Sequence, residues 1–235
     1  LEFRRVLFRS GTMLELIPYD SLPEEILMFR ESIRRFVDKE LIPLEHSLGP
    51  DGLLEESQAE AVRERARAAG LWLLDVPEEV GGLGLSLLPL AVFWEEVGRS
   101  TVASWVRHHG LFGPTVGPIL LGLNESQREQ YLYPVVEGKK KFCFAQTEPD
   151  AGSDPSGMRT RAVKTDSGYR INGVKRFITR AGEADFALVM AVTDPNTKAR
   201  NGVSCFIVDM KSPGVKLASA ERTVMGDRPW EIAFE

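Results

Sequence analysis

The feature that most constrains the fold is a change of hydrophobic periodicity near residue 140. Before it, apolar residues recur at steps of three and four, which is typical of helices with one buried face. After it, short apolar runs alternate with turn residues at regular spacing, which is typical of an antiparallel sheet or barrel. Helices first and strands second predict an α+β protein of two domains. We expect an all-α helical domain over 13–139 and an antiparallel β-barrel-like domain over 140–235.

Several local signals place the helices of the first part. One helix is expected to end near Pro43, because six apolar residues share one helical face. These are Ile26, Phe29, Ile33, Phe36, Val37 and Leu41. A second helix is expected over about 55–69, with Gly70 as its stop. Residues 76–86 carry three glycines and predict a loop.

Two capping signals place further helices. Ser86 is expected to cap a helix that stops near Gly98. Asn124, followed three residues later by Gln127, forms a capping-box signature. In the second part, strands are predicted over 142–145, 159–163, 169–171, 174–179, 186–193, 203–209 and 215–218. Among the turns between them, Asn172-Gly173 is the strongest hairpin signal.

Both ends of the chain look abrupt. Residues 1–10 resemble a translated adapter rather than a signal peptide, since they lack a continuous apolar core. We interpret 1–12 as a non-native extension and expect native sequence from Met13. The last six residues predict a strand that is broken off without a closing turn, and Trp230 is expected to pack against the barrel. The β domain is therefore expected to be incomplete at its C-terminal end.

Composition excludes several classes of function. The net charge is −5, so nothing favours nucleic acid or an anionic membrane surface as a partner. No apolar run approaches the roughly 18 residues of a transmembrane helix. Cys143 and Cys205 lie in apolar stretches without metal-ligand spacing, and we interpret both as packed free thiols, which favours a cytoplasmic location. The adjacent pair His108-His109 cannot present two ligands on one helix face, so no metal site is expected.

Residues 144–154, FAQTEPDAGSD, carry the most chemistry. Threonine and a Gly-Ser turn offer a hydroxyl and accessible backbone N–H groups, which suit a flavin ring and its pyrophosphate. Composition alone favours an ordinary loop in which Asp150 and Asp154 bond to nearby backbone.

A paired motif favours the flavin interpretation instead. T-E-P-x-A-G-S-D over 147–154, followed by N-G-x-K-x-F-I-T over 172–179, resembles the signature of the acyl-CoA dehydrogenase family. The similarity extends over most of the chain from Met13. It implies FAD as the cofactor, an acyl-CoA as the substrate and an electron-transfer flavoprotein as the electron acceptor. It also implies a homo-oligomer, since family members are usually homotetramers or dimers.

The resemblance also implies the residues of the site. Phe144, Gln146 and Thr147 would line the flavin ring, with main-chain N–H groups and the Thr147 hydroxyl bonding its pyrimidine edge. Gly152 and Ser153 would meet the pyrophosphate, and Ser153 would also contact the pantetheine arm of the substrate.

The second motif would add Phe177 against the flavin and Thr179 as a donor to flavin N5. The bland alternatives are that Phe144 and Phe177 are core residues and that Thr179 is simply a good strand former. Arg180 departs from the asparagine that is usual in the family, and it could alter the turn or pair with a phosphate.

Three other carboxylates are not expected to act as the catalytic base. Glu95 and Glu96 are most simply the solvated side of a helix, and the resemblance gives Glu148 a structural role. In the family, a glutamate from a C-terminal four-helix domain removes the α-proton of the acyl thioester while flavin N5 takes hydride from the β-carbon. We expect that domain to lie beyond residue 235, so we assign no catalytic base. We expect residues 1–235 alone to be inactive and to bind FAD weakly.

Three alternatives remain open from the sequence. Two are enzymes of the same fold, an acyl-CoA oxidase and a flavin monooxygenase. The third is a non-catalytic module that binds acyl-CoA or flavin.

Overall fold

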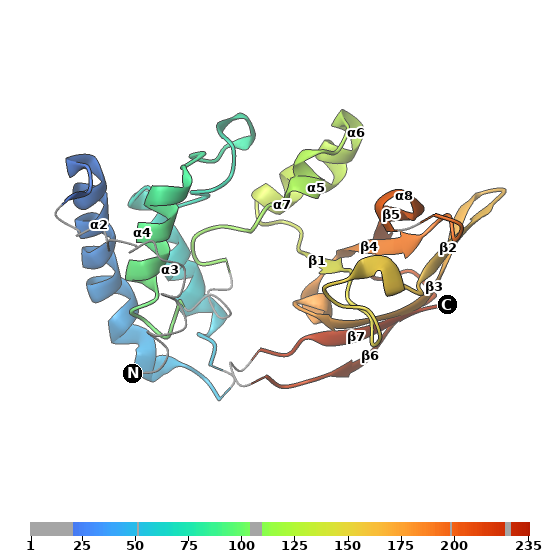
Figure 1. Ribbon diagram of the computed structural model, residues 1–235. Coiled ribbons are helices and arrows are strands. Elements are labelled where there is room, and N and C mark those ends of the chain that lie inside the picture. The colour runs from blue at the N-terminus through green and yellow to red at the C-terminus, as the bar shows by residue number, and fades with distance from the viewer. Residues whose placement is uncertain (1–20, 51, 104–109, 198, 224–226) are drawn as a thin grey trace, which may run out of the picture.

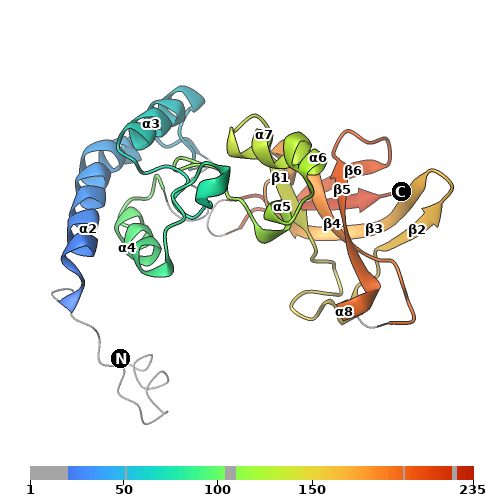
Figure 2. The same ribbon diagram turned by 90° about the horizontal axis from the view of Figure 1, so that it is seen from above.

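The computed structural model describes residues 21–50, 52–103, 110–197, 199–223 and 227–235, and all structural statements refer to these residues. Helices come first and a curled sheet follows, as Figures 1 and 2 show. The predicted fold class is confirmed. His108-His109 lies outside the described residues. Within the described part, no helix is both long and apolar enough to cross a lipid bilayer.

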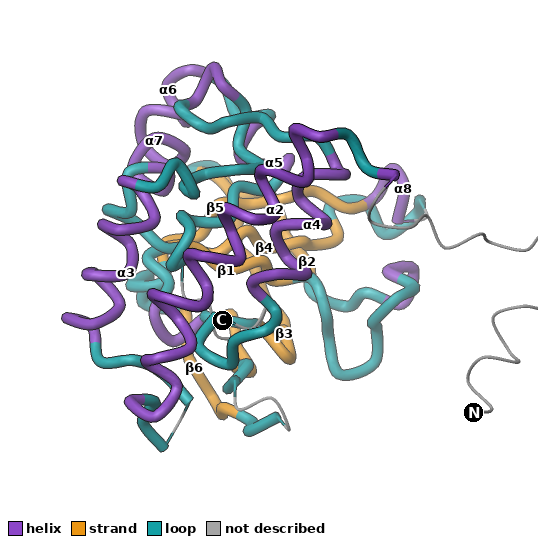
Figure 3. Tube along the Cα trace, turned by 90° about the vertical axis from the view of Figure 1, so that its left-hand side faces the viewer, coloured by secondary structure: helices purple, strands orange, loops and turns teal. Residues whose placement is uncertain are grey.

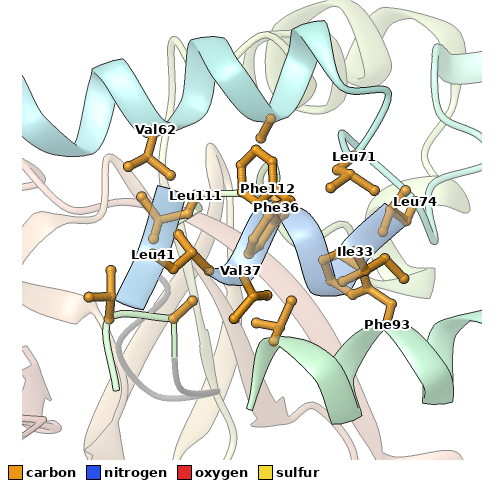
Figure 4. Packing of buried hydrophobic residues seen from close by; sticks show 14 of the residues in the cluster. Ile33, Phe36, Val37, Leu41, Val62, Leu71, Leu74, Phe93, Leu111 and Phe112 are labelled. Atoms are coloured by element: carbon orange, nitrogen blue, oxygen red, sulfur yellow. The ribbon is translucent and has the colours of Figure 1, made fainter. Parts of the chain in front are cut away.

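Three helices build the first hydrophobic core. They are α2 (Glu24–Phe36), which continues through a π turn (Val37–Leu41) and a 3-10 turn (Ile42–Ser47), α3 (Glu56–Ala68) and α4 (Leu87–Val97). Viewed along the molecule from this end, they lie in front of the sheet (Figure 3). Figure 4 shows the predicted face of α2, including Ile33 and Phe36, pointing at side chains from α3 and α4. Phe112 joins this core, with its ring centroid 4.9 Å from that of Phe93.

A buried charge cluster links α2 to α4 and overturns one expectation. Glu96 is not on a solvated face: it is 1% exposed, whereas Glu95 is exposed. Its carboxylate lies 2.8 Å from Arg30 Nε and 2.8 Å from Arg34 Nη2. Helix α4 thus turns Glu96 toward α2. The arginines of α2 supply the positive charge that a buried carboxylate requires.

Shorter helices connect the first core to the sheet. They are α5 (Pro118–Leu121), α6 (Glu125–Gln127), a π turn (Arg128–Leu132) and α7 (Tyr133–Val136). The capping box is confirmed, since Gln127 N–H donates to Asn124 Oδ1 at 3.0 Å and Asn124 N–H donates to Gln127 Oε1 at 3.3 Å. Leu132, Val135 and the ring of Tyr131 pack on the sheet, with the Tyr131 and Phe186 centroids 5.0 Å apart.

The sheet has seven strands in the order β1-β4-β2-β3-β7-β6, with β5 paired to β4. Their bounds are β1 (Phe142–Ala145), β2 (Arg161–Thr165), β3 (Gly168–Ile178), β4 (Phe186–Val192), β5 (Val203–Asp209), β6 (Val215–Ala220) and β7 (Trp230–Phe234). The sheet is mixed rather than wholly antiparallel, because β1 and β2 run parallel to β4. Parallel strands need a crossover connection, and the chain between β1 and β4 and between β2 and β4 is long enough to form one. A tight hairpin could join only antiparallel strands.

The prediction of a hairpin turn at Asn172-Gly173 is wrong. Strand β3 runs straight through this pair, and the turn lies instead between Thr165 and Gly168, which face each other across the β2–β3 hairpin. At Asn172-Gly173 the strand changes partner, since Asn172 pairs with Arg161 of β2 and Gly173 pairs with Phe234 of β7. A Cβ on Gly173 would lie 2.6 Å from the Thr160 Cα, so the glycine permits a close approach of two backbones.

Two further expectations have mixed outcomes. Trp230 packs in the barrel as predicted, where its ring lies against Gly182. Both cysteines are free thiols, but only Cys143 is buried, and burial raises its pKa to about 12. Cys205 is exposed, because it points outward from β5, a strand that pairs only with β4.

The close approach at Gly173 gives the first prediction. Gly173→Ala should lower the free energy of unfolding by about 2–3 kcal/mol, because the new methyl group overlaps Thr160 at a positive φ of 154°. Guanidinium unfolding followed by circular dichroism measures the loss.

Gly168→Ala is the matched control. Gly168 also has a positive φ, of 146°, but a Cβ there would meet nothing within 4 Å. It should cost about 1 kcal/mol. Equal losses in the two variants would show that the contact with Thr160 does not matter.

Candidate functional site

Two segments far apart in the sequence lie side by side at the candidate site. The first is the loop that follows β1, and the second is the end of β3. The backbone N–H of Arg176 donates to Thr147 O at 2.8 Å, and Lys175 Nζ donates to Gln146 O at 2.9 Å. The two sequence motifs therefore form one structural unit.

A buried ion pair lies at the centre of this unit. Lys175 is fully buried and Glu148 is 6% exposed. Lys175 Nζ lies 2.8 Å from Glu148 Oε1, while the other donors to this carboxylate are the N–H groups of Arg159, at 2.6 Å, and Thr160, at 2.9 Å. Charges survive in a protein interior only when they are paired and hydrogen-bonded in this way.

The same contacts determine the protonation state of Glu148. Burial raises the pKa of its carboxyl, but hydrogen bonds from Lys175, Thr160 and Arg159 outweigh burial and hold the pKa below its ordinary value. The carboxylate is thus ionised at neutral pH and fully engaged. The structural role expected for Glu148 agrees with this geometry.

The aromatic residues of the two motifs face outward. Phe144 is 45% exposed, because the alternation of β1 turns it away from the buried neighbours Cys143 and Ala145. Phe177 is 52% exposed and has a positive φ of 59°. The β3–β7 register shifts between Lys175 and Ile178, and such a bulge re-aims a side chain. Neither ring is a core residue, so the bland alternative for both is wrong.

The Gly-Ser turn lies on the surface of the loop. Glu148 and Ala151 close the loop with a pair of backbone hydrogen bonds of 2.8 and 3.3 Å. Gly152 and Ser153 follow as an exposed bend, and a Cβ on Gly152 would meet nothing within 4 Å. In the described part of the chain, no hydrogen bond joins Gly152 or Ser153 to β3. Asp154 accepts from the Ser156 N–H at 2.9 Å, which is the local bond expected of a turn.

Thr179 is exposed in the turn that follows β3. Arg180 next to it has a positive φ of 64°, a conformation that asparagine adopts more easily than arginine. The Arg180 side chain forms an ion pair with Glu183, with Nε and Oε1 2.5 Å apart. The departure from the usual asparagine thus leaves a left-handed turn in place.

These residues fit a flavin dinucleotide. Two exposed aromatic rings offer flat surfaces for an isoalloxazine ring. Thr147, Thr179 and Ser153 provide hydroxyls, and the Gly152-Ser153 bend provides backbone N–H groups with open space around them. Among the described residues, no group of three or more histidine, cysteine, aspartate or glutamate side chains could hold a metal ion.

Sequence reasoning assigned no role to Lys175. A signal was present in the sequence, because the alternation of a strand places Lys175 on the same face as the apolar Ile171. An inward lysine in a strand requires a buried partner, and the nearest motif offers Glu148.

The helical domain, the curled sheet and this site define the class to which the chain belongs. Residues 23–139 match the model of the acyl-CoA dehydrogenase N-terminal domain, and residues 143–233 match the model of the acyl-CoA dehydrogenase middle domain. The chain belongs to the acyl-CoA dehydrogenase family.

Individual relatives agree with this assignment. The chain is 35% identical to the mitochondrial short-chain specific acyl-CoA dehydrogenase of Rattus norvegicus, over 85% of this chain and 47% of the relative. It is 36% identical to the caffeyl-CoA reductase-Etf complex subunit CarC of Acetobacterium woodii, over 84% of this chain and 51% of the relative. A glutaryl-CoA dehydrogenase from Mycobacterium smegmatis, solved in complex with FADH2, superposes with a TM-score of 0.70 at 25% identity, covering 94% of this chain and 55% of that one. The chain thus spans about half the length of these relatives.

The ion pair gives the second prediction. Glu148→Ala should lower the free energy of unfolding at pH 7 by about 3–5 kcal/mol, because it leaves the buried ammonium of Lys175 without a counter-charge. Asp150→Ala is the control from the same loop: Asp150 is exposed and pairs with Arg159 at 2.9 Å, so its loss should cost under about 1 kcal/mol. Chemical denaturation at pH 7 compares the two, and similar losses would contradict a special role for Glu148.

The pH dependence has a definite sign. The folded-state pKa of Glu148 is lowered, so its stabilisation is present above the unfolded value of about 4.3 and is lost as pH falls through the folded value. The deficit of Glu148→Ala relative to the unsubstituted protein should therefore shrink below pH 4. If the difference in free energy of unfolding between the variant and the unsubstituted protein stayed constant as the pH fell below the folded-state pKa of Glu148, this account would be contradicted.

Proposed function

We propose that the protein is an FAD-dependent acyl-CoA dehydrogenase that removes hydrogen from the α- and β-carbons of an acyl-CoA thioester. The observation that carries the proposal is the outward display of Phe144 and Phe177 on two segments that hydrogen bonds lock together around Thr147. Exposure of aromatic rings to water is unfavourable, so two exposed rings on a rigid support indicate a binding site, and their flat faces can stack on a flat ligand.

The residues would divide the binding of the cofactor among them. Phe144, Gln146 and Thr147 would line the flavin ring, with the Thr147 N–H and hydroxyl as donors to its pyrimidine edge. The exposed Gly152-Ser153 bend would bind the pyrophosphate, and Ser153 would also contact the pantetheine arm. When bound, FAD would supply the acceptor for the hydride that leaves the β-carbon.

The second motif would complete this wall of the site. Phe177 would cover the ring, and the Thr179 hydroxyl would donate to the flavin atom at which hydride arrives. We do not assign Glu148 as the catalytic base, since its carboxylate is already engaged by three donors. No other described residue of the two motifs is assigned that role.

The remaining expectations become part of the proposal. An electron-transfer flavoprotein is the proposed electron acceptor, which is supported by similarity to a subunit of an Etf complex. The domain bounds of 13–139 and 140–235, a homo-oligomeric full-length protein and a cytoplasmic location stay predictions.

Anaerobic mixing of the full-length protein with acyl-CoA thioesters tests the third prediction. The absorbance of the oxidised flavin should bleach in a single turnover, because an acyl-CoA dehydrogenase reduces its flavin before it meets an electron acceptor. In a separate aerobic assay, oxygen consumption should stay low, and rapid consumption would favour an oxidase or a monooxygenase instead. A flavin that no thioester bleaches would favour a binding module.

Phe177→Ala provides the fourth prediction. The variant should bind FAD about tenfold more weakly, because an aromatic contact is worth on the order of 1 kcal/mol beyond its area. Stability should change little, since the ring is exposed.

Tyr169→Ala is the matched control for this variant. Tyr169 is also 52% exposed and lies on the same strand, but it packs on Phe206, outside both motifs. Titration of the full-length apoprotein with FAD, followed by flavin fluorescence, compares the two. Equal weakening in both variants would argue against a flavin contact at Phe177.

A further inference from the structure

The peptide bond between Gln146 and Thr147 has an orientation that the structure fixes. Its carbonyl accepts from the buried ammonium of Lys175 at 2.9 Å, so it points into the β domain. In a planar trans peptide the N–H points opposite to the C=O, and the described chain contains no cis peptide bond. The Thr147 N–H is therefore directed away from Lys175, toward the outside.

The neighbouring peptide bond is fixed independently. Thr147 O accepts from the Arg176 N–H at 2.8 Å, and the Glu148 N–H donates to Ala151 O at 2.8 Å. By contrast, no acceptor among the described residues receives the Thr147 N–H. The Thr147 N–H is thus a backbone donor without an acceptor in a segment whose other peptide groups are hydrogen-bonded. In the sequence, Thr147 lies between the exposed Phe144 and Phe177.

The ammonium of Lys175 gives the Gln146 carbonyl a charged donor, which a strand backbone could not supply. It is fully buried, and its charge is balanced by Glu148, which β-domain backbone N–H groups hold in place. A charge-assisted hydrogen bond is stronger than a neutral one, so it resists rotation of the peptide better than a backbone donor would.

We propose that Lys175 is a positioning residue for flavin binding: its ammonium, anchored by Glu148, orients the 146–147 peptide so that the Thr147 N–H faces the cofactor. This inference rests on the proposed function. It assigns Lys175 a role in cofactor binding in addition to its role in stability. Since a reduced flavin carries more negative charge than an oxidised one, a lost donor should weaken binding and make the reduction potential more negative.

Three variants of the full-length protein separate positioning from stability. Lys175→Met removes the donor to the Gln146 carbonyl and leaves Glu148 without its cation, so both the unfolding midpoint and the FAD affinity should fall. Lys175→Met/Glu148→Gln also removes the charge, and the glutamine oxygen still accepts one of the two backbone N–H groups, those of Arg159 and Thr160, that the carboxylate oxygens bind. Its unfolding midpoint should recover toward that of the unsubstituted protein. Glu96→Gln is the control, because it breaks another buried carboxylate pair, with Arg30 and Arg34 in the helical core.

FAD affinity and the flavin reduction potential are measured for each variant well below its unfolding midpoint. The double variant should bind FAD about tenfold more weakly, the effect of losing one oriented hydrogen bond, and its potential should be more negative. Glu96→Gln should lose stability with neither change.

The other outcomes overturn the inference. If the double variant regains FAD affinity and potential together with its stability, the ion pair is only structural. If Lys175→Met binds FAD with unchanged affinity and potential, the orientation of the peptide does not depend on Lys175. If the unsubstituted protein binds no FAD at all, the proposed function itself fails, and that result is distinct from the other two.

Discussion

The ammonium of Lys175 and the carboxylate of Glu148 meet at 2.8 Å inside the β domain, and the candidate site depends on this contact. Through it, the loop after β1 is tied to β3, and the backbone around Thr160 is drawn against both. Gly173 belongs to the same arrangement, since its missing side chain lets Thr160 come close. A buried ion pair contributes little net stability compared with apolar packing, but it is intolerant of change in either partner. It therefore specifies one arrangement of the two motifs.

Because these polar contacts occupy the inside, the outside is free to display ligand-binding groups. The left-handed backbone at Phe177 turns an aromatic ring out of a strand, at a cost in strain of about 1–3 kcal/mol. Strain of this kind persists where neighbouring contacts over-determine the backbone, and the Arg176 to Thr147 hydrogen bond beside it does so. Rigid support and exposed aromatic rings together support the proposal that a flat cofactor binds at this site.

Much of this could be predicted from the sequence, and three of the failures share a cause. Helix faces, the capping box and most strands follow from local periodicity, which Ile33 or Asn124 illustrate. These three errors concern partners that are distant in the chain. Asn172-Gly173 has the composition of a hairpin, but the strand continues because β7 supplies a new partner there. Glu96 appeared solvated because its arginines lie on another helix, some 62 residues away for Arg34. The role of Lys175 was missed for the same reason, since Glu148 is 27 residues distant.

An experimental structure of the full-length protein with FAD bound tests the central claim most directly. The account predicts that the isoalloxazine ring lies against Phe177, that the Thr147 N–H donates to its pyrimidine edge, and that Lys175 still bonds the Gln146 carbonyl. A flavin bound elsewhere would contradict it, as would a flavin at this site with the Thr147 N–H turned inward.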